Sequence, residues 1–301
     1  MLVVLIVHML HPISMTVTKN EKTAQRVWFI TGCSSGFGRL LAEQVLKAGD
    51  KVVATARNIA SIADLEKTYA KTARALSLDV THPEQIRAAV DQALEHFGHV
   101  DVLVNNAGYG LMAAIEEASD DEIKRVIETN VYGTVNVTRA FLPHFRARRS
   151  GHILNVSSIA GIISTPGLGY YNLTKFAVEG FTEALATELT PLGVKVTIIE
   201  PGPFRTKFLG GSAVFAKARI EDYKETAGKT LDTMTAYAGQ QKGDPLKAVE
   251  AIVQVVNSPE PPLRLLLGAA AWRRFHDKIE LLERDAKAWE KVTLGADFPE
   301  K

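Results

Sequence analysis

Short apolar runs alternate with amphipathic segments along most of this chain. Apolar runs of about four to eight residues are typical of buried strands, and apolar residues spaced three and four apart are typical of helices that bury one face. Strand and helix in repeated alternation predict a parallel sheet covered by helices on both faces, with ligands bound at the carboxyl ends of the strands. We therefore expect an α/β fold, a doubly wound parallel sheet, in a single domain over residues 26–301. The expected strands are residues 27–30, 51–56, 75–78, 102–104, 151–156, 195–199 and 263–267, and the expected helices lie near residues 40–46, 62–69, 83–97 and 120–146 and after residue 168.

The first expected strand is followed by a glycine-rich loop, T-G-C-S-S-G-F-G, at residues 31–38. Glycines let the backbone approach a pyrophosphate, and the positive end of the helix that follows stabilises its charge. The spacing departs from G-x-G-x-x-G, so a turn that joins strand to helix without a ligand is an equal alternative for this loop alone. The candidate cofactor-binding residues are Gly32, Ser34, Ser35, Gly36, Phe37 and Gly38.

The second expected strand ends in A-T-A-R-N, residues 54–58. In dinucleotide-binding folds an acidic residue at this end binds the ribose hydroxyls of NAD, whereas a basic residue accommodates the 2′-phosphate of NADP. Here Ala56 stands in the place of the acidic residue and Arg57 follows it. We therefore expect NADP(H) in preference to NAD(H), with Arg57 binding the phosphate. An exposed arginine without a ligand is the alternative.

A small-residue turn and a helical asparagine follow further along the chain. The fourth expected strand runs into Asn105-Asn106-Ala107-Gly108, where a flat ring can pass close to the backbone. Asn130 lies among apolar residues of a helical stretch, and a buried asparagine needs hydrogen-bond partners. Those partners are either backbone groups or parts of a functional site, and the sequence leaves both open.

The segment from residue 155 to residue 175 carries the strongest candidate chemistry. If it is helical from residue 168, Tyr171 and Lys175 lie one turn apart on the same face. A free phenol has a pKa of about 10, and a nearby ammonium group favours the phenolate and lowers this pKa. Ser158, from the end of the preceding strand, is placed to bind the same substrate oxygen, which predicts interconversion of a carbonyl and an alcohol. A tyrosine packed beneath a solvated lysine is the alternative for the Y-x-x-x-K spacing.

Composition and charge narrow the class of protein. With 46% hydrophobic residues, a chain of 301 residues can bury a full core. Its 35 basic and 34 acidic side chains give a net charge of +1, so nucleic acid is not an expected partner. The single cysteine, Cys33, excludes an internal disulfide and agrees with a reducing compartment, for which we expect the cytoplasm. The eight histidines show no ligand spacing, and we expect no metal site.

Residues 1–25 are expected to form a flexible leader. Residues 1–10 are apolar but much shorter than the ~20 residues that span a bilayer, so we expect no integral membrane span. No basic residue precedes this run and no small-residue cleavage site follows it, unlike a secretory signal. Two interpretations of residues 1–14 stay open: a leader ahead of a true start at Met15, and a weak contact with a membrane or a partner.

The combined motifs resemble those of the classical short-chain dehydrogenase/reductase family over about residues 26–268. Ser158 lies thirteen positions before Tyr171, the separation usual in that family, which favours it over Ser157. The resemblance implies a Rossmann fold and an oxidoreductase. The segments TGCSSGFGR, ATARN and PPLRLLLG are similar to the subgroup of 17β-hydroxysteroid dehydrogenases and retinol dehydrogenases. The motifs are T-G-x-x-x-G-x-G at 31–38, N-N-A-G at 105–108, Asn130, Ser158, Y-x-x-x-K at 171–175 and P-G-x-x-x-T at 201–206.

The resemblance also implies a role for each matching residue. Tyr171 would be the general acid/base, Lys175 would bind the nicotinamide ribose and lower the pKa of the tyrosine, and Ser158 would orient the substrate oxygen. Asn130 would hold a water molecule in a proton relay. The remaining cofactor-binding candidates are Asp79 and Val80 at the adenine, Asn105, Ala107 and Gly108 along the cleft, and Pro201, Gly202 and Thr206 in the turn beside the carboxamide.

Two later segments are predicted to complete the substrate side. Residues 204–243 mix apolar and polar side chains between glycines and are expected to form a hinged lid; a surface helical pair over the sheet edge is the alternative. The apolar content favours a lipophilic carbonyl or secondary alcohol as the small-molecule substrate. Residues 271–291 are expected to form a C-terminal helix whose apolar stripe packs in the core or against another subunit, with a pocket wall or a partner surface as alternatives. The stripe is Trp272, Phe275, Ile279, Leu282, Ala286 and Trp289.

The resulting hypothesis is an NADP(H)-dependent oxidoreductase in which hydride passes between nicotinamide and a carbonyl carbon while Tyr171 handles the proton. The alternative is an NADPH-sensing binding protein on the same scaffold that turns nothing over, and an epimerase or dehydratase is a third option. The resemblance further implies a homodimer or homotetramer formed through the helix after Lys175, which carries Phe176, Phe181, Leu185 and Leu189.

Overall fold

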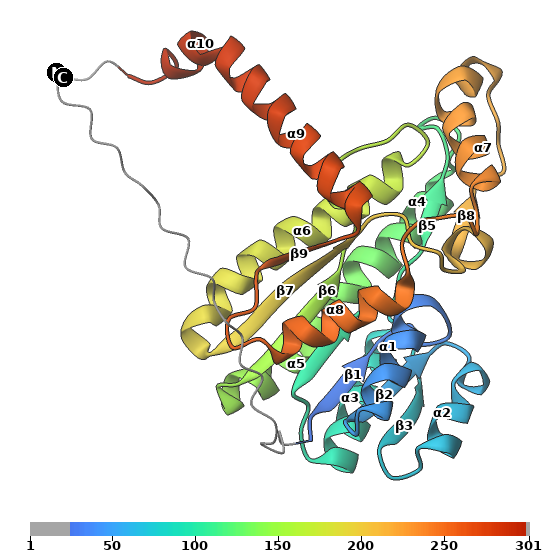
Figure 1. Ribbon diagram of the computed structural model, residues 1–301, viewed down its shortest axis with the longest axis vertical. Helices are drawn as coiled ribbons and strands as arrows, with labels where there is room; N and C mark the ends of the chain where they lie inside the picture. The colour runs from blue at the N-terminus through green and yellow to red at the C-terminus, as the bar shows by residue number, and fades with distance from the viewer. Residues whose placement is uncertain (1–24, 299–301) are drawn as a thin grey trace.

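The computed structural model describes residues 25–298, so the predicted leader, its apolar run and Met15 lie outside the described residues. Seven parallel strands form one sheet in the order β3-β2-β1-β4-β6-β7-β9, which confirms the predicted doubly wound α/β fold (Figure 1). The strands are β1 Val27–Ile30, β2 Lys51–Ala56, β3 Ala73–Ser77, β4 Val102–Asn105, β6 Gly151–Val156, β7 Val194–Pro201 and β9 Arg264–Leu267.

The order of the strands determines where a ligand can bind. From β1 the chain adds β2 and then β3 on one side, and it crosses back so that β4 pairs with the other side of β1. The connections that follow β1 and β4 run in opposite directions. A crevice therefore forms between them at the carboxyl ends of these two strands. The glycine loop follows β1 and the N-N-A-G turn follows β4, so the two motifs face each other there.

Helices cover both faces of the sheet (Figure 1). Buried side chains of α1, α2 and α8 pack on one face, and those of α3, α5 and α6 pack on the other. Both faces of the strands are therefore buried, which explains the continuous apolar runs in the sequence. These helices are α1 Gly36–Lys47, α2 Ala63–Thr68, α3 Pro83–Phe97, α5 Gly133–Arg148, α6 Gly169–Leu189 and α8 Pro245–Asn257.

The helical stretch expected at residues 120–146 contains a π-helical turn. Helix α4, Asp120–Ile127, begins at Ser119, whose side chain forms a capping box with Glu122. A π-helical turn over Glu128–Tyr132 then leads directly into α5. A π-turn inserts an extra residue into the helix and is often found at functional sites. It turns the side chain of Asn130 into the protein, where it is 1% exposed.

Two short strands that the sequence did not predict form a second parallel sheet. They are β5, Gly110–Met112, and β8, Ala213–Phe215. β8 belongs to the segment expected to be a lid, which also contains α7, Lys229–Ala236. This segment packs on the body through Leu231, which is 3% exposed and lies against Gly167. The β5–β8 pairing therefore holds the predicted lid segment over the carboxyl edge of the main sheet.

The C-terminal helix does not pack as core. Helix α9, Ala269–Ala288, and the short α10, Glu290–Leu294, project away from the body (Figure 1). Trp272, Leu282 and Trp289 are 59%, 55% and 65% exposed. The prediction that the apolar stripe packs in the core of this chain is therefore wrong, because α9 extends past the edge of the sheet instead of lying across it. Among residues 25–298, no helix is both long and apolar enough to cross a membrane.

Candidate active site

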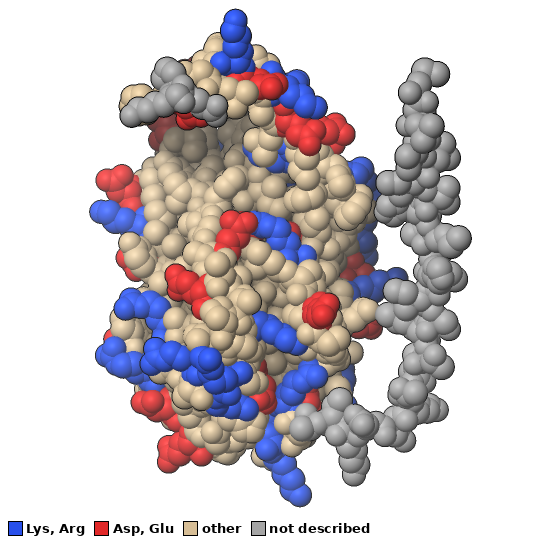
Figure 2. Space-filling view, turned by 90° about the vertical axis from the view of Figure 1, so that its left-hand side faces the viewer, with Lys and Arg blue, Asp and Glu red and all other residues tan. Residues whose placement is uncertain are grey.

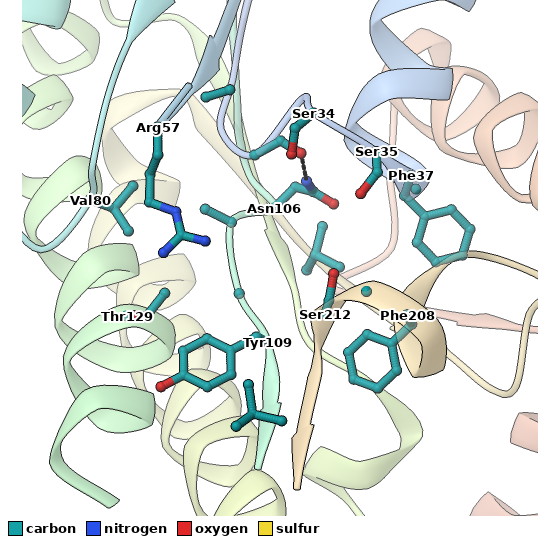
Figure 3. A pocket seen from close by; sticks show the side chains of 18 of the residues that line it. Ser34, Ser35, Phe37, Arg57, Val80, Asn106, Tyr109, Thr129, Phe208 and Ser212 are labelled. Atoms are coloured by element: carbon teal, nitrogen blue, oxygen red, sulfur yellow. Dashed lines mark hydrogen bonds between the residues drawn. The ribbon is translucent and has the colours of Figure 1, made fainter. Parts of the chain in front are cut away.

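A cavity of about 880 Å³ opens at the carboxyl ends of the central strands (Figure 3). Arg57 and Tyr109 enter it on one side, and Phe37 and Phe208 on the other. Its volume lies within the range of ~300–1,000 Å³ typical of ligand sites. Thirteen of the predicted site residues line it: Gly32, Ser34, Ser35, Gly36, Phe37, Arg57, Asp79, Val80, Ala107, Gly108, Tyr171, Lys175 and Thr206.

The other predicted site residues lie outside the lining of the cavity. The side chain of Asn105 is buried and donates to Thr138 Oγ1 and Asn155 Oδ1, at 2.9 and 2.8 Å, so it ties β4 to α5 and β6. The residues placed outside the lining are Gly38, Asn105, Asn130, Ser158, Pro201 and Gly202.

The glycine loop is shaped for close approach of another group. Gly32 has φ +72°, and a Cβ on it would lie 2.9 Å from Ala107 Cα. A Cβ on Gly38 would lie 2.4 Å from the Asn106 side chain, so only glycine fits there. Helix α1 begins at this loop with no side-chain cap and no acidic residue in its first turn. Its free N–H groups and positive end therefore face the cavity, which fits the pyrophosphate of a dinucleotide.

Asn106 joins the two loops that flank the crevice. Its Nδ2 donates to the carbonyl oxygens of Thr31 and Gly32 at 2.8 and 3.1 Å, and the Thr31 hydroxyl accepts from the backbone N–H of both Asn106 and Ala107. The sequence prediction named Asn105 and not Asn106. Asn105 is the last residue of β4 and its side chain is buried in the core, whereas Asn106 lies in the turn beyond the strand, so the end of the strand decides which of the two reaches the cavity.

Tyr171 and Lys175 meet at the base of the cavity, one turn apart on α6. Lys175 Nζ lies 5.7 Å from the centroid of the Tyr171 ring and donates to Val156 O at 2.8 Å. Lys175 is only 7% exposed. The Ser158 hydroxyl accepts from Ala160 N–H at 3.1 Å and donates to Pro201 O at 3.3 Å. The structure thus brings the predicted phenol, ammonium and hydroxyl groups to one place.

The electrostatics of this pair differ from the prediction. Burial raises the pKa of Tyr171 to about 12, and the neighbouring Ser158 hydroxyl acts in the opposite direction. Burial also lowers the pKa of Lys175 to about 8, against the attraction of Glu179. The expected lowering of the tyrosine pKa by the lysine is therefore not found, because loss of solvation outweighs every attraction to the phenolate. Tyr171 is a neutral phenol at pH 7.

Asn130 supports the same region from the π-turn. Its Oδ1 accepts from Tyr109 N–H at 2.9 Å, and its Nδ2 donates to Tyr109 O and Thr174 Oγ1 at 2.8 and 3.1 Å. A Cβ on Gly108 would lie 3.0 Å from Asn130 Oδ1 and 3.9 Å from Lys175 Nζ. The partners of Asn130 thus include backbone groups, and they join the turn after β4 to the face of α6 that carries Thr174.

An aromatic side chain from the lid segment covers the tyrosine. The rings of Phe208 and Tyr171 are 5.7 Å apart, and a Cβ on Gly110 would lie 2.9 Å from Phe208 Cζ. Leu111 and Val214, from β5 and β8, line the same end of the cavity. Phe208 falls within the lid predicted at residues 204–243, and nothing local in the sequence indicates that it reaches Tyr171.

Comparison with known proteins identifies the family. The model of the short chain dehydrogenase family matches residues 26–214, which is more than half of the chain. The chain belongs to the short-chain dehydrogenase family. This confirms the resemblance seen in the sequence, and because the relatives include oxidoreductases, the alternative of a binding protein without turnover is not favoured.

Curated relatives of this short-chain dehydrogenase match it over most of its length. Oxidoreductase BOA17 of Botryotinia fuckeliana is 38% identical and covers 90% of this chain and 99% of its own. The 3-ketodihydrosphingosine reductase of Bacteroides thetaiotaomicron is 34% identical, with coverage of 88% and 93%. Human retinol dehydrogenase 8 is 35% identical, with coverage of 80% and 81%.

Solved structures of other dehydrogenases share the fold. A short-chain dehydrogenase from Streptomyces avermitilis superposes with a TM-score of 0.85 at 40% identity, over 92% of this chain and 100% of its own. An enzyme from Burkholderia phymatum in complex with NAD gives 0.74 at 27% identity, over 86% and 95%. An alcohol dehydrogenase from Thermococcus sibiricus complexed with 5-hydroxy-NADP gives 0.66 at 25%, over 81% and 96%. Both dinucleotides therefore occur among proteins similar to this one.

Proposed function

We propose that this short-chain dehydrogenase transfers hydride between NADP(H) and the carbonyl or secondary alcohol carbon of a lipophilic substrate. One observation carries the proposal: Tyr171 and Lys175 meet at the base of the same cavity that begins at the open N-terminus of α1. When bound, the dinucleotide supplies or accepts the hydride. The protein's own residues position the substrate, exclude water and handle the proton.

Each of the four predicted catalytic residues has a separate task. Tyr171 is protonated at pH 7 because burial raises its pKa to about 12, so it donates a proton to a carbonyl oxygen during reduction. Ser158 orients that oxygen from the end of β6. Lys175, with a pKa of about 8, carries a positive charge at pH 7 and stabilises negative charge that develops on the phenol oxygen. Asn130 fixes the turn that carries Gly108 through its hydrogen bonds to Tyr109. We propose that it also holds a water molecule of the proton relay.

The adenosine end of the cavity favours NADP(H) over NAD(H). Arg57 is exposed at the end of β2 and directs its guanidinium group into the cavity near Val80 and Thr129 (Figure 3). Within residues 25–298, it forms no ion pair with a carboxylate of the chain. Ala56 offers no carboxylate to a ribose hydroxyl. An unpaired guanidinium at this place supports binding of a 2′-phosphate.

Arg57→Ala is expected to reverse the cofactor preference. A hydrogen bond to a charged group contributes about 1.5–3 kcal/mol, so the KM for NADPH should rise ~10- to 100-fold while the KM for NADH stays the same. Steady-state rates with both cofactors measure this. Arg87→Ala, which removes an exposed arginine of α3 outside the cavity, is the matched control and should change neither value. An unchanged NADPH preference in Arg57→Ala would refute the phosphate assignment.

The substrate end of the cavity is apolar. Leu111, Phe208 and Val214 line it beside Tyr171, and the β5–β8 sheet holds two of them in place. The names of two relatives, a retinol dehydrogenase and a ketodihydrosphingosine reductase, refer to lipophilic substrates of those proteins, which supports the same class here. NADPH oxidation against a panel of steroids, retinoids, long-chain ketones, quinones and sugar phosphates tests this. Turnover of sugar phosphates alone would refute the lipophilic class, and NADPH binding without any turnover would favour a binding protein.

The surface of α6 supports a homodimer or homotetramer. Of the residues predicted for this face, Phe176 is 42% exposed, with Leu173 near it at 49%, whereas Leu185 and Leu189 are buried in the core of the chain. Figure 2, which views the molecule from the side of α6, shows few charged side chains over the middle of that face. Apolar surface of this kind is typical of a subunit interface. We further propose that the protein lies in the cytoplasm, because the single cysteine of the chain is buried and reduced.

A further inference from the structure

Helix α9 carries an apolar stripe that the rest of the described chain leaves uncovered. Only its base is attached to the body, where Ala271 is fully buried and Arg274 donates to Thr165 Oγ1 at 2.7 Å. All residues from 281 to 298 are exposed. A helix of 20 residues is about 30 Å long, and isolated helices are marginally stable without a packed face. The exposed stripe therefore indicates a partner helix.

The spacing of the stripe is that of a two-helix seam. From Trp272 to Trp289 its six residues are separated by three, four, three, four and three positions. This is the a/d pattern of a coiled coil, in which each helix presents a narrow apolar stripe to its partner. A helix that lies on a sheet or a large groove has a wider apolar face. The pattern thus indicates a partner that is itself a single helix with the same spacing.

We propose that α9 pairs in antiparallel orientation with α9 of a second copy of this chain. The twofold axis passes between Glu280 and Leu281, and the pairing is isologous, as in most homodimers. In this register the largest side chains meet at the two ends and a large side chain meets a small one between them, which fills the seam evenly. Trp272 faces Trp289 of the second copy, Phe275 faces Ala286, and Ile279 faces Leu282.

The charges along α9 support the antiparallel orientation. Residues 272–279 carry three basic and one acidic side chain, a net charge of +2, whereas residues 280–290 carry two basic and four acidic side chains, a net charge of −2. Antiparallel pairing opposes these halves, and parallel pairing would bring like charges together. In the antiparallel register Lys278, beside the stripe, lies opposite Asp285 of the second copy, and the symmetry forms this pair twice.

Other occupants of the stripe fit the charges less well. Residues 1–14 contain no Lys, Arg, Asp or Glu, so they offer nothing to complement the two halves. A membrane surface is usually anionic, and the net charge of −2 on residues 280–290 opposes it. The proposed pairing does not depend on the reaction proposed for the active site.

Disulfide trapping tests the pairing and its direction. The only native cysteine, Cys33, is buried, so a disulfide between two chains must form through the engineered cysteines. Full-length Trp272→Cys and Trp289→Cys variants are mixed in equal amounts and oxidised gently. The antiparallel register predicts a covalent dimer in the mixture and little in either variant alone, because identical positions lie roughly 25 Å apart along the seam at 1.5 Å per residue. A dimer formed by each variant alone would show parallel pairing, and no dimer in any sample would overturn the proposal.

The mass of the assembly in solution provides a second test. Leu282→Glu, at an exposed position, is expected to lower the mass by a factor of two, and α9 should lose part of its helicity because it then lacks a packed face. Lys278→Glu should weaken the assembly, and the double variant Lys278→Glu/Asp285→Lys should restore it, since the pair is remade across the axis. Glu250→Lys on the exposed face of α8 is the control.

Three outcomes would each overturn the proposal. The first is an unchanged mass in Leu282→Glu, and the second is loss of the assembly when residues 1–14 are deleted. The third is flotation of the protein with phosphatidylcholine–phosphatidylserine vesicles, if Leu282→Glu abolishes that flotation.

Discussion

Tyr171→Phe is expected to abolish turnover while NADPH still binds. The substitution removes the hydroxyl group proposed to protonate the substrate oxygen and leaves the ring that packs 5.7 Å from Phe208. General acid catalysis contributes about 10²- to 10⁴-fold to a rate, so kcat should fall by that factor. Steady-state kinetics and a fluorescence titration with NADPH measure the two effects separately.

The neighbouring tyrosine is a matched control for this variant. The hydroxyl of Tyr170 donates to Ile115 O at 2.8 Å, and Tyr170 does not line the cavity. Tyr170→Phe removes the same atom one position earlier and should keep nearly full activity. If Tyr171→Phe retained activity against a substrate that the wild-type protein turns over, Tyr171 would not be the general acid.

The pH dependence of the reduction follows from the same group. Because the pKa of Tyr171 is raised to about 12, the phenol stays protonated through the neutral range. Loss of this proton can slow reduction only at strongly alkaline pH, whereas the charge of Lys175 is lost from about pH 8 upward. A decline of the reduction rate that begins near pH 8 would therefore report Lys175 and not Tyr171.

Arg264→Ala is expected to cause the largest loss of stability. Arg264, on β9, bonds to three carboxylates: Glu179, at 2.6 Å, and Glu183, at 2.5 Å, on α6, and Glu200 at the end of β7. Glu200 is fully buried and Glu179 is 5% exposed. Removing the guanidinium leaves two buried carboxyl groups without their cation, which costs about 3–5 kcal/mol. In a chain of 301 residues the melting temperature should fall by roughly 5–8 °C.

The loss of stability in Arg264→Ala should depend on pH. Burial and the neighbouring Glu179 raise the pKa of Glu200 to about 7, above the usual value for glutamate. A carboxyl group whose pKa is higher in the folded state binds more protons there, so stability falls as pH rises from about 4.5 towards 7. In Arg264→Ala, which lacks the guanidinium, the fall in stability with rising pH is larger. The difference in melting temperature between wild type and variant should therefore be small at pH 5 and largest near pH 8.

A second arginine provides the comparison for Arg264. Arg39 also bonds to two carboxylates, Glu43 and Asp64, but Asp64 has a side chain that is 60% exposed. Pairs on the surface contribute about 0–1 kcal/mol, so Arg39→Ala should change the melting temperature little at any pH. Adding Glu200→Gln to Arg264→Ala should recover part of the stability. If Arg264→Ala lowered the melting temperature by the same amount at pH 5 and at pH 8, the loss of stability could not be assigned to buried carboxylates.

The sequence by itself determined the elements whose signals are local. Residues 27–30, 51–56, 83–97 and 151–156 form strands or helices with the boundaries predicted from their apolar spacing. The glycine loop and the Y-x-x-x-K pair were also found from the sequence, because each depends on residue types at fixed short separations along one element. The parallel sheet followed from the alternation of these elements.

Only the tertiary structure decided what depends on distant segments. β5 and β8 are three residues each and about 100 positions apart, so neither is recognisable before they pair. The position of Phe208 over Tyr171 depends on how the lid segment folds back over α6, and the choice of Asn106 over Asn105 at the cavity depends on the turn that follows β4. The raised pKa of Tyr171 depends on burial by those segments. The spacing of the stripe on α9 shows that this apolar face needs a partner, but spacing is a local property. Only the fold shows that residues 25–298 do not cover it.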